Sequence, residues 1–211
     1  GDRMFVGSNK GGVSKIYNLE LTNLDLKYIS QFDLCHTSIF SNIETELEEL
    51  RKGAKYLSID LSDRYDEEYL KQWCRYFDCV EISCGDMQED EVTGLINRIL
   101  KYGCRHMVIA TRGSKGAVIS VEGRIYCQSA CLVEALDTMG AGDSFITSFL
   151  VNYLEGMKDA ADFPVCPEMC GVTTAQEYEE ILVKYSLYRA AVFASRQCKR
   201  EGSFGYGVKF E

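Results

Sequence analysis

Three small residues followed by an aspartate form the clearest chemical signal in this sequence. Gly140, Ala141 and Gly142 lead directly into Asp143, between a run typical of a strand and a run typical of a helix. With no bulky side chain in the way, the backbone N–H groups of such a turn can approach a ligand, and the start of a helix adds unpaired N–H groups and a positive dipole end. The pattern predicts an anion site, suited to a phosphate or a transferring phosphoryl group. Asp143 is interpreted either as a base aimed at the ligand or as a simple helix cap.

Strand-like and helix-like runs alternate along the chain and must position this turn. Strands are expected at 2–6, 32–40, 56–60, 78–82 and 106–111, with a hairpin of 117–121 and 124–128 about Glu122-Gly123. A strand-like run over 125–136 leads into the turn, and helices are expected at 24–31, 43–52, 67–76, 89–102, 145–154 and 174–199. This alternation predicts a three-layer α/β fold, with a mostly parallel sheet and helices on both faces. Ligands of such folds bind at the carboxyl ends of the strands.

Composition and charge exclude several other kinds of protein. The chain has 211 residues, 46% of them hydrophobic, and a formal charge of −9. A chain of this length can bury a proper core in one domain. The negative charge argues against nucleic acid or an anionic membrane as a partner. The sequence has no run with the length and apolarity of a membrane span and no signal peptide, so a cytoplasmic location is expected.

The cysteines and histidines carry no metal-binding pattern. Ten cysteines are many for a chain of this size, but their closest pairs have the spacing C-x3-C with no histidine nearby. Free, buried thiols are therefore expected rather than zinc ligands or disulfides. His36 and His106 lie in strand-like apolar runs and are interpreted as core or rim residues.

Three further segments follow predicted strands and so fall where ligands would bind. The first, Thr111–Gly116, has two glycines, although a tight turn into the hairpin would need the same residues. The second places Asp60 and Arg64 after a strand, where the alternative is a surface turn with a local ion pair. The third contains Asp86 and Glu89, which a capping box at the start of a helix explains equally well.

The string from Asp137 to Phe145, read as a whole, resembles the second signature of the ribokinase-like (PfkB) sugar kinases, D-T-x-G-A-G-D-x-F. The match has nine residues and falls in the expected strand–turn–helix context. The resemblance implies that Asp143 is the catalytic base. It also implies that the amides of Gly140, Ala141 and Gly142 form the anion hole, and that Asp137 and Thr138 belong to the cofactor site.

The three strand-end segments fit the same family. Residues 111–116 resemble its T-x-G-x-x-G loop, which implies nucleotide contacts from Thr111, Gly113, Lys115 and Gly116. Residues 60–64 resemble its D-x-N-x-R segment, with Ser62 in place of Asn, which implies that Asp60 and Arg64 face the substrate and phosphates. Residues 86–89 resemble its N-x-x-E segment with Asp86 in place of Asn, which implies that Glu89 organises Mg²⁺ through water.

The front of the chain departs from the family pattern. Full members have several strands and helices ahead of the position of Asp2, including a Gly-Gly substrate signature, and Gly11-Gly12 lies in the wrong place to replace it. The chain is therefore expected to be an N-terminally truncated PfkB kinase domain over 1–211. Within it, 1–20 would be a remnant of the lid and substrate region, and 21–211 the nucleotide-binding α/β core.

The resemblance implies ATP-dependent phosphorylation of a sugar or sugar-amine hydroxyl with Mg²⁺, with K⁺ and a homodimer as further expectations. Strings such as Phe32–His36 and Gln88–Asp90 resemble the fructoselysine 6-kinase branch. Fructose, ribose or a nucleoside stay open as acceptors, and so does a truncated, non-catalytic nucleotide-binding relative. A Rossmann-type oxidoreductase is disfavoured because no G-x-G-x-x-G follows a first strand.

Overall fold

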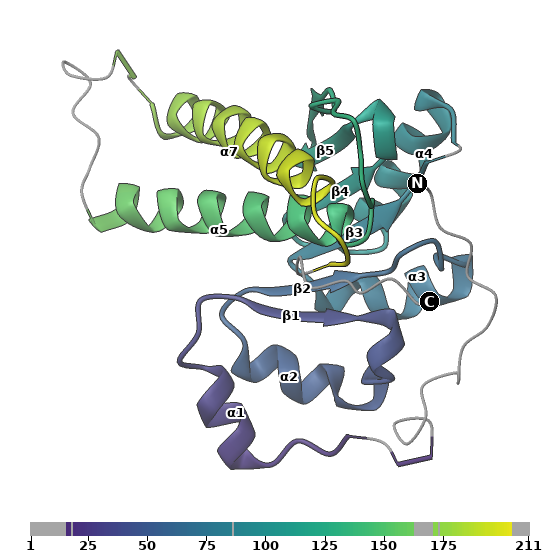
Figure 1. Cartoon of the computed structure of the whole chain (residues 1–211). Helices are drawn as coiled ribbons and strands as arrows, with labels where there is room; N and C mark the ends of the chain where they lie inside the picture. The colour runs from purple at the N-terminus through teal and green to yellow at the C-terminus, as the bar shows by residue number, and fades with distance from the viewer. Residues whose placement is uncertain (1–15, 18, 86, 163–170, 173, 204–211) are drawn as a thin grey trace. The chain divides into compact units, whose positions relative to one another are not determined.

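The computed structural model describes residues 16–17, 19–85, 87–162, 171–172 and 174–203 (Figure 1). The chain divides into two compact units, one up to Cys127 and the other from Gln128 onward. The strand predicted at 2–6 lies outside the described residues.

The first unit is organised on a sheet of six strands in the order β1-β2-β3-β4-β5-β6. Their bounds are β1 Cys35–Ser38, β2 Leu57–Asp60, β3 Cys79–Ser83, β4 Met107–Thr111, β5 Ala117–Val121 and β6 Arg124–Gln128. Strands β1 to β4 run parallel to one another, and β5 runs antiparallel to β4. The mostly parallel sheet of an α/β fold is confirmed.

Helix α1 Asn23–Ile29 precedes β1, and three helices connect the parallel strands: α2 Leu47–Gly53, α3 Glu67–Trp73 and α4 Glu89–Lys101. The single 3₁₀ turns are η2 Ile39–Ser41, η3 Glu44–Glu46, η4 Cys74–Tyr76 and η5 Gly113–Lys115. The helix predicted over 43–52 is thus split into a 3₁₀ turn and α2. Because each crossover leads to the next strand along and such crossovers are right-handed, α2, α3 and α4 fall on one face of the sheet.

The core of the first unit lies between that face and these three helices. Alternate strand residues point into it, among them Ile59, Val80, Ile82 and Val108, each at most 1% exposed. The helices complete the core from their buried stripes. On α4 this stripe is Val92, Leu95, Ile96 and Ile99, which have the i, i+3, i+4, i+7 spacing of an amphipathic helix.

The hairpin before the second unit has the predicted turn, but the strand after it is shorter than predicted. Glu122 and Gly123 have φ values of 48° and 80°, as a two-residue type I′ turn requires. The prediction of a strand to Leu136 is wrong, because β6 ends at Gln128. Beyond it the backbone bonds elsewhere: the N–H of Leu136 donates to the carbonyl of Cys198 at 2.8 Å rather than to a strand.

The second unit contains two long helices, α5 Ala141–Asp162 and α7 Ala175–Gln197, which pack against each other. Helix α5 extends beyond the predicted 145–154 at both ends, whereas α7 lies close to the predicted 174–199. Thr174 caps α7 in a capping box with Glu177. The two helices approach closely at Gly156, where a Cβ atom would come within 2.4 Å of Leu182 Cδ1.

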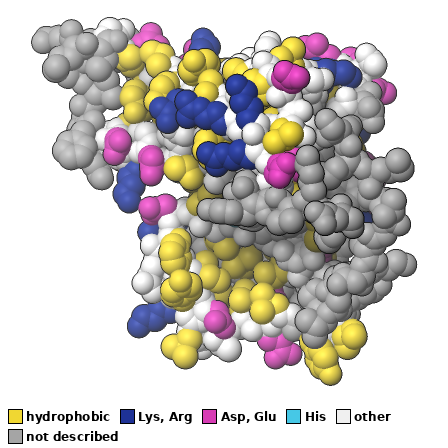
Figure 2. All heavy atoms as spheres, in the orientation of Figure 1, with side chains coloured by type: hydrophobic (Ala, Val, Ile, Leu, Met, Phe, Trp, Pro, Cys, Tyr) yellow, Lys and Arg dark blue, Asp and Glu magenta, His cyan; other side chains and the backbone are white. Residues whose placement is uncertain are grey.

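Helix α1 is largely a surface element of the first unit. It has no buried residue, and Leu24 and Tyr28 are 78% and 61% exposed. Figure 2 shows hydrophobic side chains gathered on the part of the surface that α1 and its neighbours form. The core therefore lies beneath α2, α3 and α4 rather than beneath α1. Among the described helices, none combines the length and apolarity that a membrane span requires.

Candidate active site

The small-residue turn of the second unit has a backbone shape that glycine alone adopts easily. Gly140 has a φ of 72°, in the left-handed region. A Cβ atom on it would lie 3.0 Å from the Cβ of Ser203, in the segment that follows α7. Gly140 is therefore required by the fold, through both its φ and its close neighbour.

The N–H groups at the start of α5 differ in what they already bind. Ala141 donates its N–H to the carbonyl of Thr138 at 3.2 Å, and Ser144 donates to the carbonyl of Gly140 at 2.9 Å. Among the described residues, no acceptor is found for the N–H groups of Gly142 and Asp143. A Cβ on Gly142 would meet nothing within 4 Å, and Asp143 is exposed. The start of α5 thus offers two free donors, open space and a carboxylate in one place.

Asp137 anchors this turn to the end of α7. Its Oδ1 accepts the N–H of Met139 at 2.9 Å, and its Oδ2 accepts the N–H of Gly202 at 3.0 Å. The backbone N–H of Asp137 also donates to the carbonyl of Cys198 at 3.3 Å. The carboxylate of Asp137 is therefore engaged by the protein's own backbone. Residues 204–211 lie outside the described residues.

In the first unit, the end of β2 carries Asp60 and Arg64. Asp60 Oδ1 accepts the N–H of Ser62 at 2.7 Å, which holds Ser62 at a φ of 53°. The guanidinium of Arg64 lies over the ring of Phe40, 4.7 Å from its centroid, and no ion pair with Asp60 is seen in the described residues. Asp60 thus shapes the turn, and Arg64 is directed toward the segment that follows β1.

The segment Thr111–Gly116 forms a tight turn at the end of β4. Arg112 donates its N–H to the carbonyl of Gly116 at 2.7 Å, and Gly113 and Gly116 have φ values of 55° and 94°. The Lys115 ammonium donates to the carbonyl of Gly85 at 3.0 Å, in the loop after β3. This loop is therefore tied to its neighbour along the carboxyl edge of the sheet.

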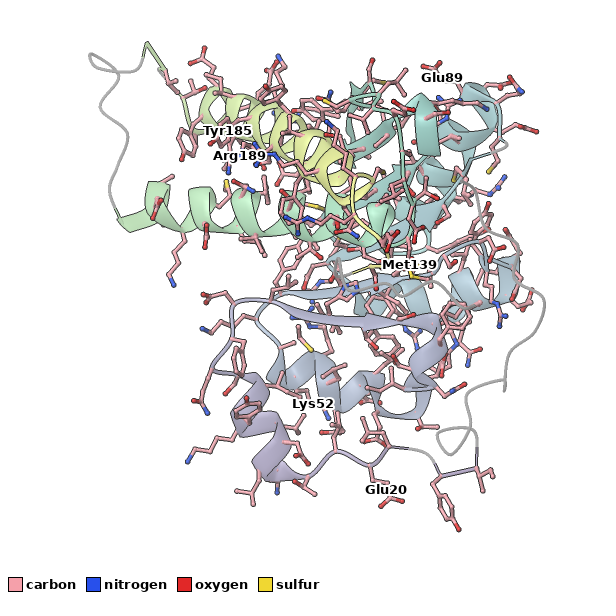
Figure 3. All side chains as sticks on the ribbon, in the orientation of Figure 1. Glu20, Lys52, Glu89, Met139, Tyr185 and Arg189 are labelled. Carbon is pink, nitrogen blue, oxygen red and sulfur yellow. The ribbon has the colours of Figure 1, made fainter. Side chains whose placement is uncertain are left out.

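Glu89 is the first residue of α4 and is exposed (Figure 3). The capping box of this helix is formed by Gln88 and Glu91, with the N–H of Gln88 donating to Glu91 Oε2 at 2.8 Å. The alternative in which Glu89 partners Asp86 in a capping box is therefore wrong for Glu89, and Asp86 lies outside the described residues. The carboxylate of Glu89 is left for another role.

The sequence did not single out Glu81, a charged residue in the middle of β3 that is fully buried. Its Oε2 lies 3.7 Å from Nδ1 of His36, which bonds Ser58 Oγ at 2.8 Å. Burial, with Glu81 nearby, raises the pKa of the Cys79 thiol well above its ordinary value. A carboxylate inside an otherwise apolar strand was the available signal. The eight cysteines in the described residues are all free.

The first unit thus brings the predicted residues of three strand ends to one edge of its sheet. The ends of β2, β3 and β4 are linked there by backbone bonds: Ser83 N–H donates to the Ser62 carbonyl at 2.7 Å, and Cys84 N–H to the Thr111 carbonyl at 2.7 Å. The second unit gathers the residues from Asp137 to Asp143 at the start of α5. Parallel strand ends and helix N-termini are the features with which α/β folds bind phosphorylated ligands.

Comparison with solved structures identifies the class of fold. The structure of ribokinase from Giardia lamblia superposes with a TM-score of 0.64 at 16% sequence identity, covering 84% of this chain and 57% of that chain. This similarity shows a ribokinase-like α/β fold.

Comparison of sequences identifies the family. Residues 22–164 match the pfkB family of carbohydrate kinases, and the chain belongs to that family. It is 34% identical over 210 residues to fructosamine kinase FrlD of Bacillus subtilis, covering 100% of this chain and 65% of the relative. It is 29% identical over 156 residues to fructoselysine 6-kinase of Escherichia coli, covering 74% and 58%. The chain therefore spans less than two thirds of the length of these curated relatives.

Proposed function

We propose that the protein transfers the γ-phosphoryl group of ATP to a hydroxyl group of a sugar or sugar-amine, with fructoselysine as the first candidate acceptor. The observation that carries this proposal is the start of α5. There, two free N–H groups and open space adjoin the exposed carboxylate of Asp143, in a member of the pfkB family. The names of the two curated relatives support the choice of acceptor.

In this proposal the turn supplies both the base and the anion hole. Asp143 accepts the proton of the attacking hydroxyl group, and the carboxylate is exposed enough to receive it. The amides of Gly140, Ala141 and Gly142 stabilise the charge of the transferring phosphoryl group, and of the three only the N–H of Ala141 already has an acceptor among the described residues. Asp137 and Thr138 complete the cofactor side of the turn.

The strand ends of the first unit supply the remaining roles. Thr111, Gly113, Lys115 and Gly116 bind the nucleotide, and Asp60 and Arg64 face the acceptor and the phosphates of the nucleotide. The exposed carboxylate of Glu89, free of the capping box, fits an ion held through water. When bound, Mg²⁺ would neutralise charge on the phosphates.

The proposal also covers the domain organisation, the location, the assembly and a monovalent ion. Residues 1–211 belong to one kinase domain, with 1–20 from the lid and substrate region and 21–211 from the nucleotide-binding core. The protein acts in the cytoplasm on a small-molecule acceptor and assembles as a homodimer. K⁺ assists turnover. Comparing rates with and without K⁺ would test the role of the ion. Measuring the mass of the protein in solution by light scattering would test the homodimer.

An ATP-to-ADP assay tests the function. It is run with Mg²⁺ on this chain and on an upstream-extended version, with fructoselysine, fructose or ribose as acceptor. Asp143→Asn should bind ATP and lose ~10²–10⁴-fold in rate, because a positioned general base typically contributes that much. Glu155→Gln, which changes an exposed carboxylate further along α5, is the matched control and should keep its rate.

The outcomes separate the alternatives. Acceptor-dependent turnover with fructoselysine supports the proposal, and turnover with only fructose or ribose would move the acceptor to a plain sugar. If neither protein turns over any acceptor while ATP is still bound, the hypothesis of a non-catalytic nucleotide-binding protein replaces the proposed kinase function. An Asp143→Asn protein that kept most of its activity would remove Asp143 from the role of base.

A further inference from the structure

The last residue of α7 holds the small-residue turn through one buried side chain. Gln197 is 7% exposed, and its Nε2 donates to the carbonyl of Met139 at 3.2 Å and to the carbonyl of Gly202 at 2.7 Å. A side-chain NH₂ group has two hydrogens, so both are used. Gln197 thus ties the turn to the segment that follows α7, across 58 positions of the sequence.

Gln197 and Asp137 bind the same two residues in opposite senses. The N–H groups of Met139 and Gly202 donate to the carboxylate of Asp137, and their carbonyls accept from Gln197. Both backbone polar groups of each residue are therefore satisfied by side chains. Buried backbone groups are costly to leave unpaired, so this arrangement resists rotation of either segment.

The bond to Met139 also sets the direction of the next N–H group. A peptide unit is planar, so the carbonyl of Met139 and the N–H of Gly140 share one plane and point in opposite directions. Holding the carbonyl toward Gln197 therefore directs the N–H of Gly140 away from it (Figure 3 labels Met139). Ser203 Cβ lies 3.0 Å from where a Cβ of Gly140 would be, so the turn is also closely packed against the segment that follows α7.

We propose that Gln197 is a positioning residue that fixes the direction of the N–H groups in the Gly140–Gly142 turn. The inference rests on the proposed function, in which this turn stabilises the transferring phosphoryl group. Stabilisation of this kind depends on donors that are already oriented before the reaction, so a loosened turn lowers the rate of the chemical step.

Amide hydrogen exchange of the full chain, followed by mass spectrometry, tests the positioning directly. Gln197→Leu removes both donors, and Gln197→Glu keeps the shape but turns acceptors toward the two carbonyls. Exchange in a peptide covering 136–144 should accelerate by about tenfold or more in both variants, because bonds that close the turn are lost. Gln176→Leu, on the exposed first turn of α7, is the matched control and should leave this peptide unchanged.

A peptide from β4 serves as the internal reference and should keep its exchange rate in every variant. Gln197→Lys, whose ammonium group again supplies donors, should restore part of the protection of 136–144. Unchanged exchange in the 136–144 peptide would overturn the positioning role. Equal acceleration in all peptides would also overturn it, because that result means general destabilisation.

Kinetics provide an independent readout. In the version that turns over an acceptor, kcat should fall in Gln197→Leu while the KM for ATP changes little, because the donors act on the transition state. Faster exchange of the turn with an unchanged kcat would overturn the inference. If the wild-type protein neither binds nor uses ATP, the proposed function fails, and the exchange experiment alone still decides whether Gln197 holds the turn.

Discussion

Gly140 and Gly142 stand two positions apart in one turn, yet the structure gives them different reasons for being glycine. Gly140 has a positive φ, and a Cβ added to it would lie 3.0 Å from the Cβ of Ser203. Gly142 has neither, because a Cβ added there would meet nothing within 4 Å. The fold therefore explains Gly140 but not Gly142. The phosphoryl group of the proposed function, placed in the open space beside Gly142, would explain it.

Substitution by alanine separates the two cases. Gly142→Ala should leave the free energy of unfolding unchanged or raise it by up to about 1 kcal/mol, because alanine favours a helix over glycine. It should weaken ATP binding or turnover by at least about tenfold, because the added methyl group enters the space next to the free amides. Phosphate oxygens must come close to the backbone to accept hydrogen bonds from these N–H groups. Denaturant unfolding and ATP titration measure the two effects.

Gly140→Ala is the comparison and should lower the free energy of unfolding by about 1–3 kcal/mol, the cost of a strained left-handed residue. Full use of ATP by Gly142→Ala would mean that the turn does not contact the phosphates. A Gly140→Ala protein with unchanged stability would mean that the turn tolerates alanine at this φ and that Ser203 moves aside.

The pairing of α5 with α7 links the turn to the rest of the second unit. Phe149 and Tyr153 of α5 stack with ring centroids 5.8 Å apart, and Tyr153 is 1% exposed. The hydroxyl of Tyr153 donates to Oε1 of Glu179, a buried residue of α7, at 2.7 Å. Helix α5 begins within the turn, at Ala141, and α7 ends at Gln197, so this contact helps to set the spacing of the two helices.

Tyr153→Phe should lower the free energy of unfolding by about 1–3 kcal/mol, because a buried carboxylate loses a donor and its desolvation is less fully offset. Tyr185→Phe is the matched control: its hydroxyl accepts from Arg189 at 3.0 Å, but the residue is 49% exposed (Figure 3). Loss of that surface bond should change stability by less than about 0.5 kcal/mol. Equal changes in the free energy of unfolding in the two variants would show that the buried hydrogen bond stabilises the protein no more than the exposed one.

Buried thiols give the first unit a pH dependence. Burial raises the pKa of Cys74 to about 12 and, with Cys74 nearby, that of Cys104 to about 12, against an ordinary value of 9.0. Between pH 9 and pH 12 the folded protein keeps thiol protons that the unfolded chain releases. The contribution of these thiols to stability is therefore fully present below pH 9 and decreases as the pH rises toward 12.

Each of these thiols should reduce the free energy of unfolding by up to about 1.4 kcal/mol per pH unit within that window. Denaturant unfolding at pH 8, 9 and 10 in the presence of a reductant measures the slope. Cys104→Ala removes one contribution and should flatten the curve, whereas replacement of the exposed Cys127 by Ala should not. A slope that is the same in all three proteins would assign the pH dependence to other groups.

Much of the fold and of the turn follows from local pattern. The strands at 117–121 and 124–128 were predicted with their bounds, because alternating residues and the Glu122-Gly123 turn determine a hairpin without help from distant parts of the chain. Helix α4 was predicted to within a residue from its apolar spacing. The family was predicted from one nine-residue string and is confirmed. The roles assigned to the site residues stay predictions.

Other features depend on partners that are distant in the sequence. The strand predicted to Leu136 ends at Gln128, because the following backbone bonds to the end of α7 and not to a strand. Ala141 gives its N–H to Thr138, while Gly142 keeps its own free, and no local pattern separates these two. Gln197 belongs to none of the motifs identified in the sequence. Its importance comes from two carbonyls, one of them 58 residues away, that only the folded chain brings to its side-chain amide.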